Sequence, residues 1–170
     1  YYSYISNEQI PVESITLALH TTIHILENDK TGCYFSEDNE DFLEESGIGK
    51  RIQAIDDLLR PNFTVHSSYD ILFGSPNTTT PLRYHTNCRQ FLCVTSGKIR
   101  VKMTPWKSSK YLHPYKDYEH YEFRSLVHPT HPSKCYMSDF EKTNFIDFEV
   151  NEVTTLYVPP YWWYSIIYLD

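Results

Sequence analysis

The sequence has 170 residues, and its 15 lysine and arginine residues against 22 aspartate and glutamate residues give a formal net charge of −7. This length fits one domain with a core of its own. The acidic balance argues against a dedicated nucleic-acid-binding protein, which needs a basic face. No apolar run approaches the length of a membrane span and no signal-peptide pattern opens the sequence, so we expect no membrane span.

The four cysteines, Cys33, Cys88, Cys93 and Cys135, form no CxxC pair. Disulfide-stabilised proteins are usually shorter and richer in cysteine, so we expect reduced thiols in an intracellular, cytoplasmic protein. The first residues, YYSYIS, are typical of an extended segment rather than of a native N-terminus, and IIYLD ends the sequence just after an expected strand. The chain is therefore a candidate fragment of a longer protein.

The first part of the chain predicts an edge strand at residues 1–6 and a helix over residues 13–26, where apolar residues recur at helical spacing. His20 and His24 share one face of this helix. Two histidines fall far short of a metal coordination sphere, and no HExxH motif accompanies them. We expect them to be polar residues on an amphipathic helix.

The next segment predicts a short strand at residues 30–35, an acidic run at residues 36–46 and a second helix at residues 50–59 that Pro61 ends. The acidic run is typical of a solvated face, and it lacks the glycine-centred spacing of a calcium loop. The apolar face of the second helix comprises Ile52, Ile55, Leu58 and Leu59.

Strand patterns dominate after residue 62, beginning with an apolar run at residues 69–73. In residues 78–105, TTTPLRYHTNCRQFLCVTSGKIRVKMTP, a threonine-proline turn leads into a strand, a Ser-Gly turn and a second strand. The second strand alternates apolar with charged residues, so we expect one face in the core and one charged face. The apolar set is Ile99, Val101 and Met103, and the charged set is Lys98, Arg100 and Lys102.

Residues 106–132 form a long, tyrosine-rich stretch that we expect to be a loop. The HPTHP sequence places His128 and His131 near each other in a proline-stiffened segment. Two residues alone chelate a metal weakly, so this spacing does not predict a metal site. We expect the exposed surface of the loop, with Tyr111, Tyr115 and Tyr118, to contact other proteins.

The last part of the chain predicts strands within residues 140–150, 155–158 and 164–168. We expect Trp162 and Trp163 to be structural, one ring inside a barrel and the other over its rim. Short helices followed by many strands predict one α+β, mainly β domain built on a β-barrel or double sheet. Within this single domain of residues 1–170, residues 1–61 form a helical N-terminal part and residues 62–170 form the β core.

Three stretches, TTTPL, FLCVTSGKIRVKMTP and YVPPYWW, resemble in order and spacing the JmjC-type cupins, the family that contains asparaginyl- and other protein hydroxylases. The chain resembles still more closely the cupin-like proteins encoded by large DNA viruses of the mimivirus kind. The resemblance covers roughly residues 69–170. It implies a double-stranded β-helix, which is a jelly roll open at one mouth, with the N-terminal helices packed on its outer face.

Active members of the family hold iron(II) with an HxD or HxE motif and a later histidine, and hold 2-oxoglutarate with a lysine. Counted from the proline of TTTPL, the HxD positions fall on Arg83 and His85, and counted back from the Ser-Gly turn they fall on Tyr84 and Thr86. The near-match in this sequence is an HxN formed by His85 and Asn87. Asparagine does not supply the negative charge of aspartate.

The other family positions also carry unusual residues: the late histidine falls on Tyr164, the lysine on Ile99, and the usual Gly-Asp reads Val153-Thr154. A neutral tyrosine is a poor ligand for iron(II), because its pKa lies near 10. With isoleucine at the lysine position, the carboxylate of 2-oxoglutarate would be buried without a cation. These independent losses argue against the family's chemistry.

We therefore expect a catalytically degenerate JmjC-like cupin that acts as a structural or protein-interaction module, with no catalytic residue, metal or cofactor. An aromatic-rich surface suits contacts with other proteins, with a capsid, a virion or another large assembly as the setting. We expect no nucleic-acid partner. The degenerate pocket would comprise Arg83, Tyr84, His85, Asn87, Lys98, Arg100 and Tyr164.

Two alternatives stay open. The first is an iron(II)/2-oxoglutarate-dependent hydroxylase with an altered metal site at His85 and Asn87, completed by a histidine such as His113 or His120. Lys98, Arg100 or Arg83 would then hold the 2-oxoglutarate. The second is a small-anion binder that uses the cupin mouth as a pocket. Its candidate residues are Arg83, Arg89, Lys98 and Arg100, although the acidic net charge favours a solvated strand face for them.

Overall fold

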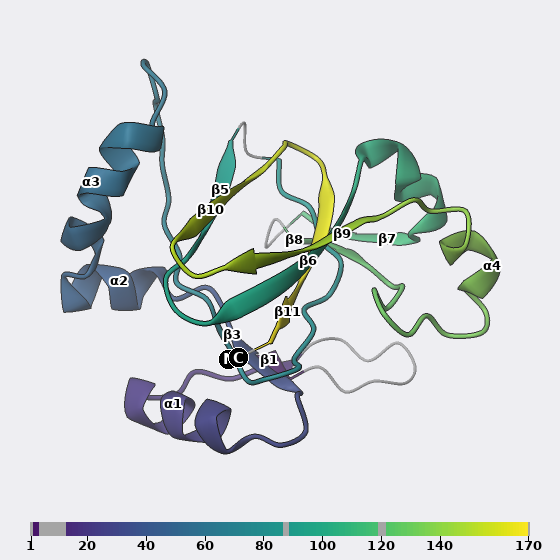
Figure 1. Cartoon of the computed structure of the whole chain (residues 1–170), viewed down its shortest axis with the longest axis horizontal. Helices are drawn as coiled ribbons and strands as arrows, with labels where there is room; N and C mark the ends of the chain where they lie inside the picture. The colour runs from purple at the N-terminus through teal and green to yellow at the C-terminus, as the bar shows by residue number, and fades with distance from the viewer. Residues whose placement is uncertain (1, 4–12, 87–88, 119–121, 170) are drawn as a thin grey trace.

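The computed structural model describes residues 2–3, 13–86, 89–118 and 122–169, which form an α+β, mainly β arrangement (Figure 1). The helices are α1 (Leu19–Asn28), α2 (Glu40–Ser46), α3 (Gly49–Leu59), α4 (Met137–Phe140) and the 3-10 helix η1 (Trp106–Tyr111). The strands are β1 (Tyr2–Ser3), β2 (Glu13–Ser14), β3 (Tyr34–Ser36), β4 (Phe73–Gly74), β5 (Gln90–Val94), β6 (Lys98–Thr104), β7 (Pro114–Asp117), β8 (Glu122–Ser125), β9 (Ile146–Asn151), β10 (Thr154–Val158) and β11 (Trp163–Tyr168). None of the described helices is long and apolar enough to cross a membrane.

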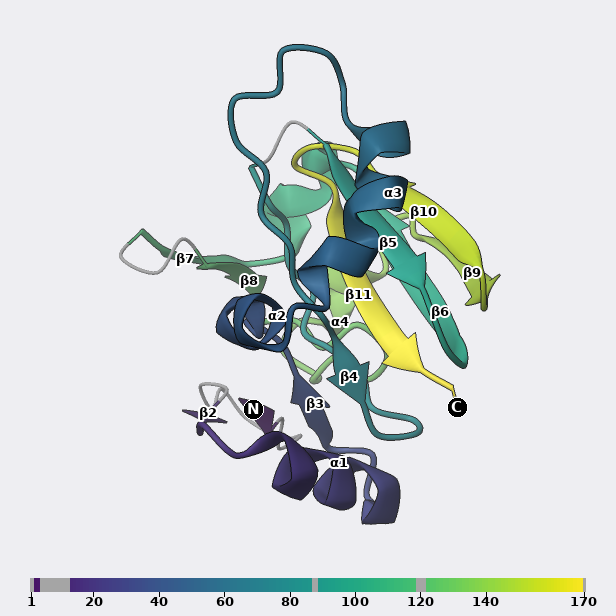
Figure 2. The same ribbon diagram turned by 90° about the vertical axis from the view of Figure 1, so that its left-hand side faces the viewer.

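Two antiparallel sheets enclose the main core (Figures 1 and 2). The first has the strand order β11-β6-β9, and the second pairs β10 with β5. Both sheets supply side chains to one buried cluster, so they pack face to face. The cluster contains Phe35, Leu92, Val94, Ile99, Val101, Met103, Val150, Val158, Tyr164, Ile166 and Tyr168.

The alternation predicted for residues 98–103 is confirmed in β6. Ile99, Val101 and Met103 are buried in the main core. On the opposite face, Lys98 forms an ion pair with Glu149 of β9. The strand therefore has one apolar and one charged face, as its period of two requires.

Residues 77–84 run antiparallel to β11, although only single bridges connect them. The backbone N–H of Thr80 donates to the carbonyl of Ile166 at 2.8 Å, and Arg83 and Tyr164 exchange backbone hydrogen bonds of 3.0 and 2.8 Å. This pairing brings the segment after TTTPL against the last strand. It is the reason why His85 and Tyr164, which lie 79 positions apart in the sequence, meet in one site.

A second, smaller core lies on the other side of this segment. It contains Leu82, Tyr84, Leu112, Phe123 and Trp163. Trp163 is fully buried there, and its indole N–H donates to Ser109 Oγ at 2.7 Å. Trp162 instead packs, partly buried, against the main core. Both tryptophans are thus structural in position, but the more deeply buried ring belongs to the second core.

The N-terminal part differs in detail from the prediction. Helix α1 begins at Leu19, not at residue 13, because residues 13–14 pair with β1 as strand β2. Ile15 and Thr16 are β-branched and favour extended backbone, which a count of helical spacing does not weigh. The N-terminal part also supplies β3 to the four-stranded sheet β2-β1-β3-β4. Helices α1, α2 and α3 lie outside the two sheets of the main core (Figure 1).

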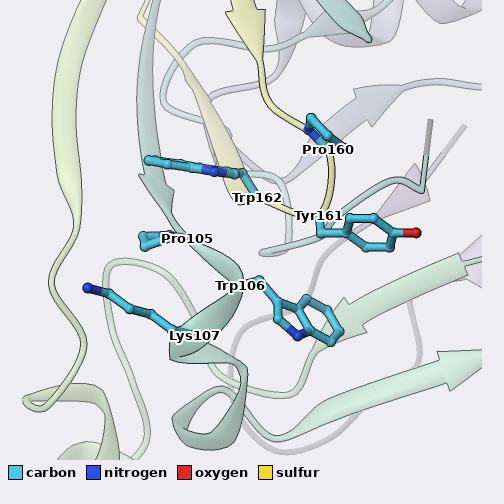
Figure 3. A pocket seen from close by; sticks show the side chains of 6 residues that line it. All are labelled: Pro105, Trp106, Lys107, Pro160, Tyr161 and Trp162. Atoms are coloured by element: carbon cyan, nitrogen blue, oxygen red, sulfur yellow. The ribbon is translucent and has the colours of Figure 1, made fainter. Parts of the chain in front are cut away.

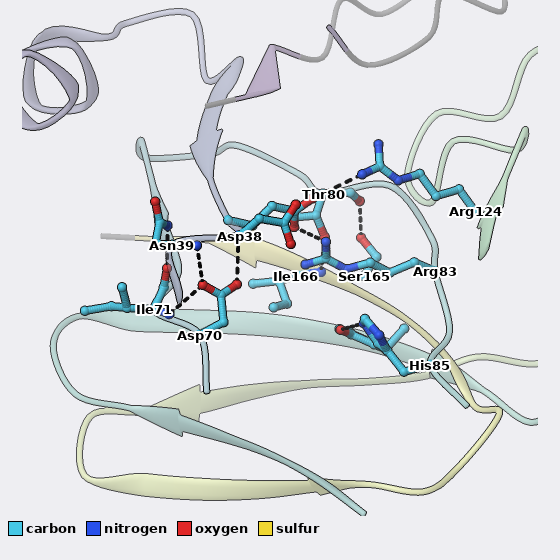
Figure 4. A network of polar contacts seen from close by, with 12 residues as sticks. Asp38, Asn39, Asp70, Ile71, Thr80, Arg83, His85, Arg124, Ser165 and Ile166 are labelled. Carbon is cyan, nitrogen blue, oxygen red and sulfur yellow. Dashed lines mark hydrogen bonds and ion pairs between the residues drawn. The ribbon is translucent and has the colours of Figure 1, made fainter. Parts of the chain in front are cut away.

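Helix α3 matches the helix predicted at residues 50–59, but its expected apolar face is not fully covered, since Leu58 is 83% exposed. The run at residues 69–73 is likewise not a full strand, because only Phe73–Gly74 pairs, as β4. The Asp70 carboxylate accepts backbone N–H bonds from Asp38 and Asn39 (Figure 4). These bonds fix the segment against the loop after β3, outside any strand ladder.

The described parts of residues 106–132, namely 106–118 and 122–132, are more ordered than the loop that we predicted from the sequence. They contain the 3-10 helix η1 and the antiparallel pair β7–β8, whose register places Tyr115 opposite Arg124. Strand β8 also bonds to residues 82–84, with Ser125 N–H donating to the carbonyl of Leu82 at 2.8 Å. These bonds attach the segment to the rest of the domain along one side. Among the cysteines, Cys33, Cys93 and Cys135 are free, and Cys88 lies outside the described residues.

Candidate functional site

Three polar side chains meet at one end of the main core. Tyr164 on β11 points to the same face of the sheet as its partner Met103 and is 1% exposed. Its hydroxyl lies 2.9 Å from His85 Nε2, and the Gln90 side-chain amide donates to the same hydroxyl at 2.8 Å. The structure thus brings together His85 and Tyr164, as expected from the sequence. Gln90 is a member of this cluster that the sequence analysis missed.

The resemblance allowed two alignments of the HxD motif, on Arg83 and His85 or on Tyr84 and Thr86. The directions of the side chains distinguish them. Arg83 and His85 both lie against the ring of Tyr164, at 5.6 Å for the guanidinium carbon and 5.8 Å between the ring centroids. Tyr84 lies between them in sequence and points the other way, into the second core. The pair Arg83 and His85 therefore occupies the inward positions, and Tyr84 is not part of the pocket that we predicted.

A buried ion pair adjoins this cluster. The guanidinium of Arg83 donates to the carboxylate of Glu37, and Arg124 donates to the other carboxylate oxygen at 3.2 Å. Arg83 and Glu37 are 8% and 4% exposed. Figure 4 shows Arg83 and Arg124 extending from different segments towards the loop that carries Asp38. Charges removed from water in this way are tolerated when they are paired and hydrogen-bonded.

Glu37 corrects the prediction of a fully solvated acidic run. It directly follows the buried strand β3, whose Phe35 belongs to the main core, and so it enters the interior with that strand. The remainder of the run forms helix α2 and its approach. A sequence pattern treats the six acidic residues alike, because nothing in their spacing identifies an arginine 46 positions later.

The environment of His85 makes its imidazole neutral at pH 7. Burial, together with the positive charge of Arg83, lowers the pKa of His85 to about 4. The neutral ring can therefore form its hydrogen bond with the hydroxyl of Tyr164 as either donor or acceptor. Two buried polar atoms nearby, Arg83 Nε and the hydroxyl of Tyr168, have no hydrogen-bond partner among the described residues.

The other candidate residues lie elsewhere. Lys98 and Arg100 are on the charged face of β6, paired with Glu149 and Asp147, so their predicted place in the pocket is wrong. Their outward direction follows from the strand's period of two. Arg89 is exposed, and Asn87 and His120 lie outside the described residues.

The remaining histidines have local partners. His113 Nε2 lies 3.0 Å from the Asp139 carboxylate. His128 Nδ1 accepts backbone N–H bonds from Thr130 and His131. Among the residues that the structure describes, no three His, Cys, Asp or Glu side chains gather where they could hold a metal ion.

The residues that the resemblance places at the metal positions, Arg83 and His85, do not fit iron(II). The guanidinium of Arg83 has no lone pair to donate and repels a cation. The Nε2 atom of His85 is engaged with Tyr164, whose hydroxyl is a neutral and poor ligand. The donor set therefore offers one imidazole nitrogen beside a fixed positive charge.

The depressed pKa of His85 predicts a pH-dependent stability. Below pH 6.5 the unfolded chain protonates this histidine, whereas the folded chain leaves it neutral down to about pH 4. The free energy of unfolding should therefore fall between pH 6.5 and pH 4. In His85→Gln we expect the free energy of unfolding to decrease less between these two pH values, by on the order of 2 kcal/mol, as measured by urea titrations at each pH. Equal slopes for wild type and His85→Gln would contradict the prediction.

Comparison with known proteins gives a distant, partial similarity. No model of a known protein family matches the chain. The chain is 28% identical over 93 residues to the JmjC domain-containing protein D of Dictyostelium discoideum, an alignment that covers 55% of this chain and 20% of that protein. The matched part thus spans about one fifth of that relative's length. This distant match supports a JmjC/cupin-type relationship, and a closer relation to viral proteins stays a prediction.

Proposed function

We propose that this chain is a catalytically degenerate JmjC-like cupin that acts as a structural or protein-interaction module. One observation carries the proposal: the side chains at the family's metal positions are bound to protein partners. Arg83 is bound to Glu37, and His85 is bound to Tyr164. A position that binds a catalytic metal would need free, preferably anionic donors.

We also propose that the fold is a double-stranded β-helix. The two face-to-face sheets, the antiparallel run of residues 77–84 along β11 and the JmjC-containing relative support this. In such a fold Arg83, His85 and Tyr164 would lie at the mouth. Packed strands and apolar side chains hold the core together without a metal.

The function would then reside on the surface, in contacts with other proteins inside the cell, with a virion or another large assembly as the setting. Exposed aromatic side chains on the β7–β8 side support this, since Tyr115 and Tyr118 are 57% and 67% exposed. Tyrosine is enriched at protein interfaces because it offers a large, rigid area and a hydroxyl.

Removing these rings should weaken assembly more than removing the degenerate site. We expect the variant with Tyr111, Tyr115 and Tyr118 replaced by serine to assemble less. The share of the tagged protein found in high-mass fractions of its native extract should fall at least about tenfold. His85→Ala should leave that share nearly unchanged, because it removes one internal hydrogen bond and no surface. Loss of assembly in His85→Ala with full assembly in the tyrosine variant would contradict the proposal.

An iron(II)/2-oxoglutarate-dependent hydroxylase remains the second candidate, favoured by the JmjC-containing relative. It would require His85 to leave Tyr164 and a further ligand, such as Asn87 or His120, to join it. 2-Oxoglutarate would need a cation other than Lys98 and Arg100, which face away.

A further inference from the structure

A shallow aromatic hollow opens beside the site, at the surface between η1 and the turn before β11 (Figure 3). Its volume is about 580 Å³. Trp106 and Tyr161 are 44% and 47% exposed, an unusual amount of solvent contact for large aromatic rings. The lining residues are Pro105, Trp106, Lys107, Pro160, Tyr161 and Trp162.

The two exposed rings are held in place from beneath. The buried ring of Tyr84 contacts Trp106 edge-on at 4.9 Å and lies 6.3 Å from Tyr161. Trp106 and Tyr161 stand at 69° to each other with centroids 5.8 Å apart. This arrangement forms a fixed aromatic corner, which binds a ligand with little loss of side-chain entropy.

The backbone at Tyr161 also holds its ring in this position. Tyr161 has a φ of +61°, a conformation that costs free energy in any residue with a Cβ. Its N–H donates to the carbonyl of His85 at 3.1 Å, which ties the turn to the segment beside β11. A strained tyrosine that is half exposed indicates a ring placed for contact rather than for the core.

The hollow offers a specific set of polar groups. Among the described residues, the indole N–H groups of Trp106 and Trp162 find no acceptor, whereas that of Trp163 donates to Ser109. Lys107 supplies the single charge in the lining. The hollow thus combines aromatic faces and proline rings with two free donors and one cation.

We propose that this hollow binds a proline-rich peptide in the polyproline II conformation that carries an acidic residue beside the proline run. The inference rests on the proposed interaction role and names its partner class. Polyproline II peptides dock in aromatic-lined grooves, and their unpaired carbonyls accept bonds from indole donors. A quaternary ammonium ligand would be repelled by Lys107, and a sugar would find none of the carboxylate or amide groups that bind several hydroxyls.

The test measures binding of a fluorescein-labelled peptide of eight prolines with glutamate at each end, by anisotropy on the full chain. We expect binding that weakens at least about tenfold when glycine replaces the prolines. Trp106→Ala and Tyr161→Gly should each weaken it by a similar factor. Tyr161→Gly is the sharper variant, because glycine accepts a positive φ and the fold should not suffer.

Val153→Gly is the matched control. Val153 also has a positive φ, is 91% exposed and lies in the turn at the other end of β10, so this variant should bind as the wild type does. Lys107→Glu should reverse the preference from glutamate-ended to lysine-ended peptides.

Three results would overturn the inference: no binding at about millimolar peptide, equal binding of the glycine peptide, or full binding by Tyr161→Gly. Binding of a disaccharide with exclusion of the peptide would assign the hollow to carbohydrate instead. None of these outcomes bears on iron or 2-oxoglutarate, so the degenerate-site proposal would stand or fall separately.

Discussion

Glu37→Gln should destabilise the folded chain by about 3–5 kcal/mol, because it leaves a buried arginine without its counter-charge. Arg83 is 8% exposed, and the Glu37 carboxylate also neutralises Arg124. The amide would hydrogen-bond to one guanidinium but could not offset two positive charges. Urea denaturation followed by tryptophan fluorescence measures the change.

An exposed pair and a double variant supply the controls for Glu37. Glu149→Gln breaks the ion pair with Lys98. Because the side chain of Glu149 is 50% exposed and that of Lys98 is 35% exposed, this change should cost about 0–1 kcal/mol. The combination of Glu37→Leu with Arg83→Met should recover only part of the loss, since apolar replacement of a buried pair is often neutral but Arg124 still loses its bond to Glu37. A Glu37→Gln cost as small as that of Glu149→Gln would show that the pair is not buried as described.

Trp163→Ala should cost about 3–5 kcal/mol, because it empties the centre of the second core. The indole is fully buried, contacts the ring of Tyr84 at 4.8 Å and donates a hydrogen bond to Ser109. The alanine variant therefore loses apolar contact and leaves an unpaired hydroxyl. The midpoint of urea unfolding measures the effect.

Two tryptophan variants check this result. Trp106→Ala removes a ring that is 44% exposed and should cost far less than Trp163→Ala. Trp163→Phe retains most of the volume and isolates the hydrogen bond to Ser109, with an expected cost of about 1–3 kcal/mol. A small effect of Trp163→Ala together with a large effect of Trp106→Ala would contradict the assignment of the second core.

The strands of the main core were predictable because their signal is local. The alternation in β6 needs only residues 98–103, and β10 and β11 stand on either side of the proline pair after residue 158. The contact between His85 and Tyr164 was also expected, but from the family resemblance, since no local pattern links residues so far apart.

The polar interior could not be predicted, because it depends on pairing between distant segments. Glu37 looked like part of a solvated run, and its partner Arg83 lies 46 positions away. Lys98 and Arg100 were assigned to the pocket by charge alone, although their strand period directs them outward. Placement of Tyr84 required the side-chain direction that the pairing with β11 fixes.

The most direct test is the metal content of protein purified without added metal and then loaded anaerobically with iron(II), with 2-oxoglutarate decarboxylation measured on the same sample after oxygen, the oxidant of that reaction, is readmitted. We expect no stoichiometric iron and no turnover, because Arg83, His85 and Tyr164 contact one another and Arg83 is paired with Glu37. Stoichiometric iron together with decarboxylation that His85→Ala abolishes would contradict the account and establish the oxygenase.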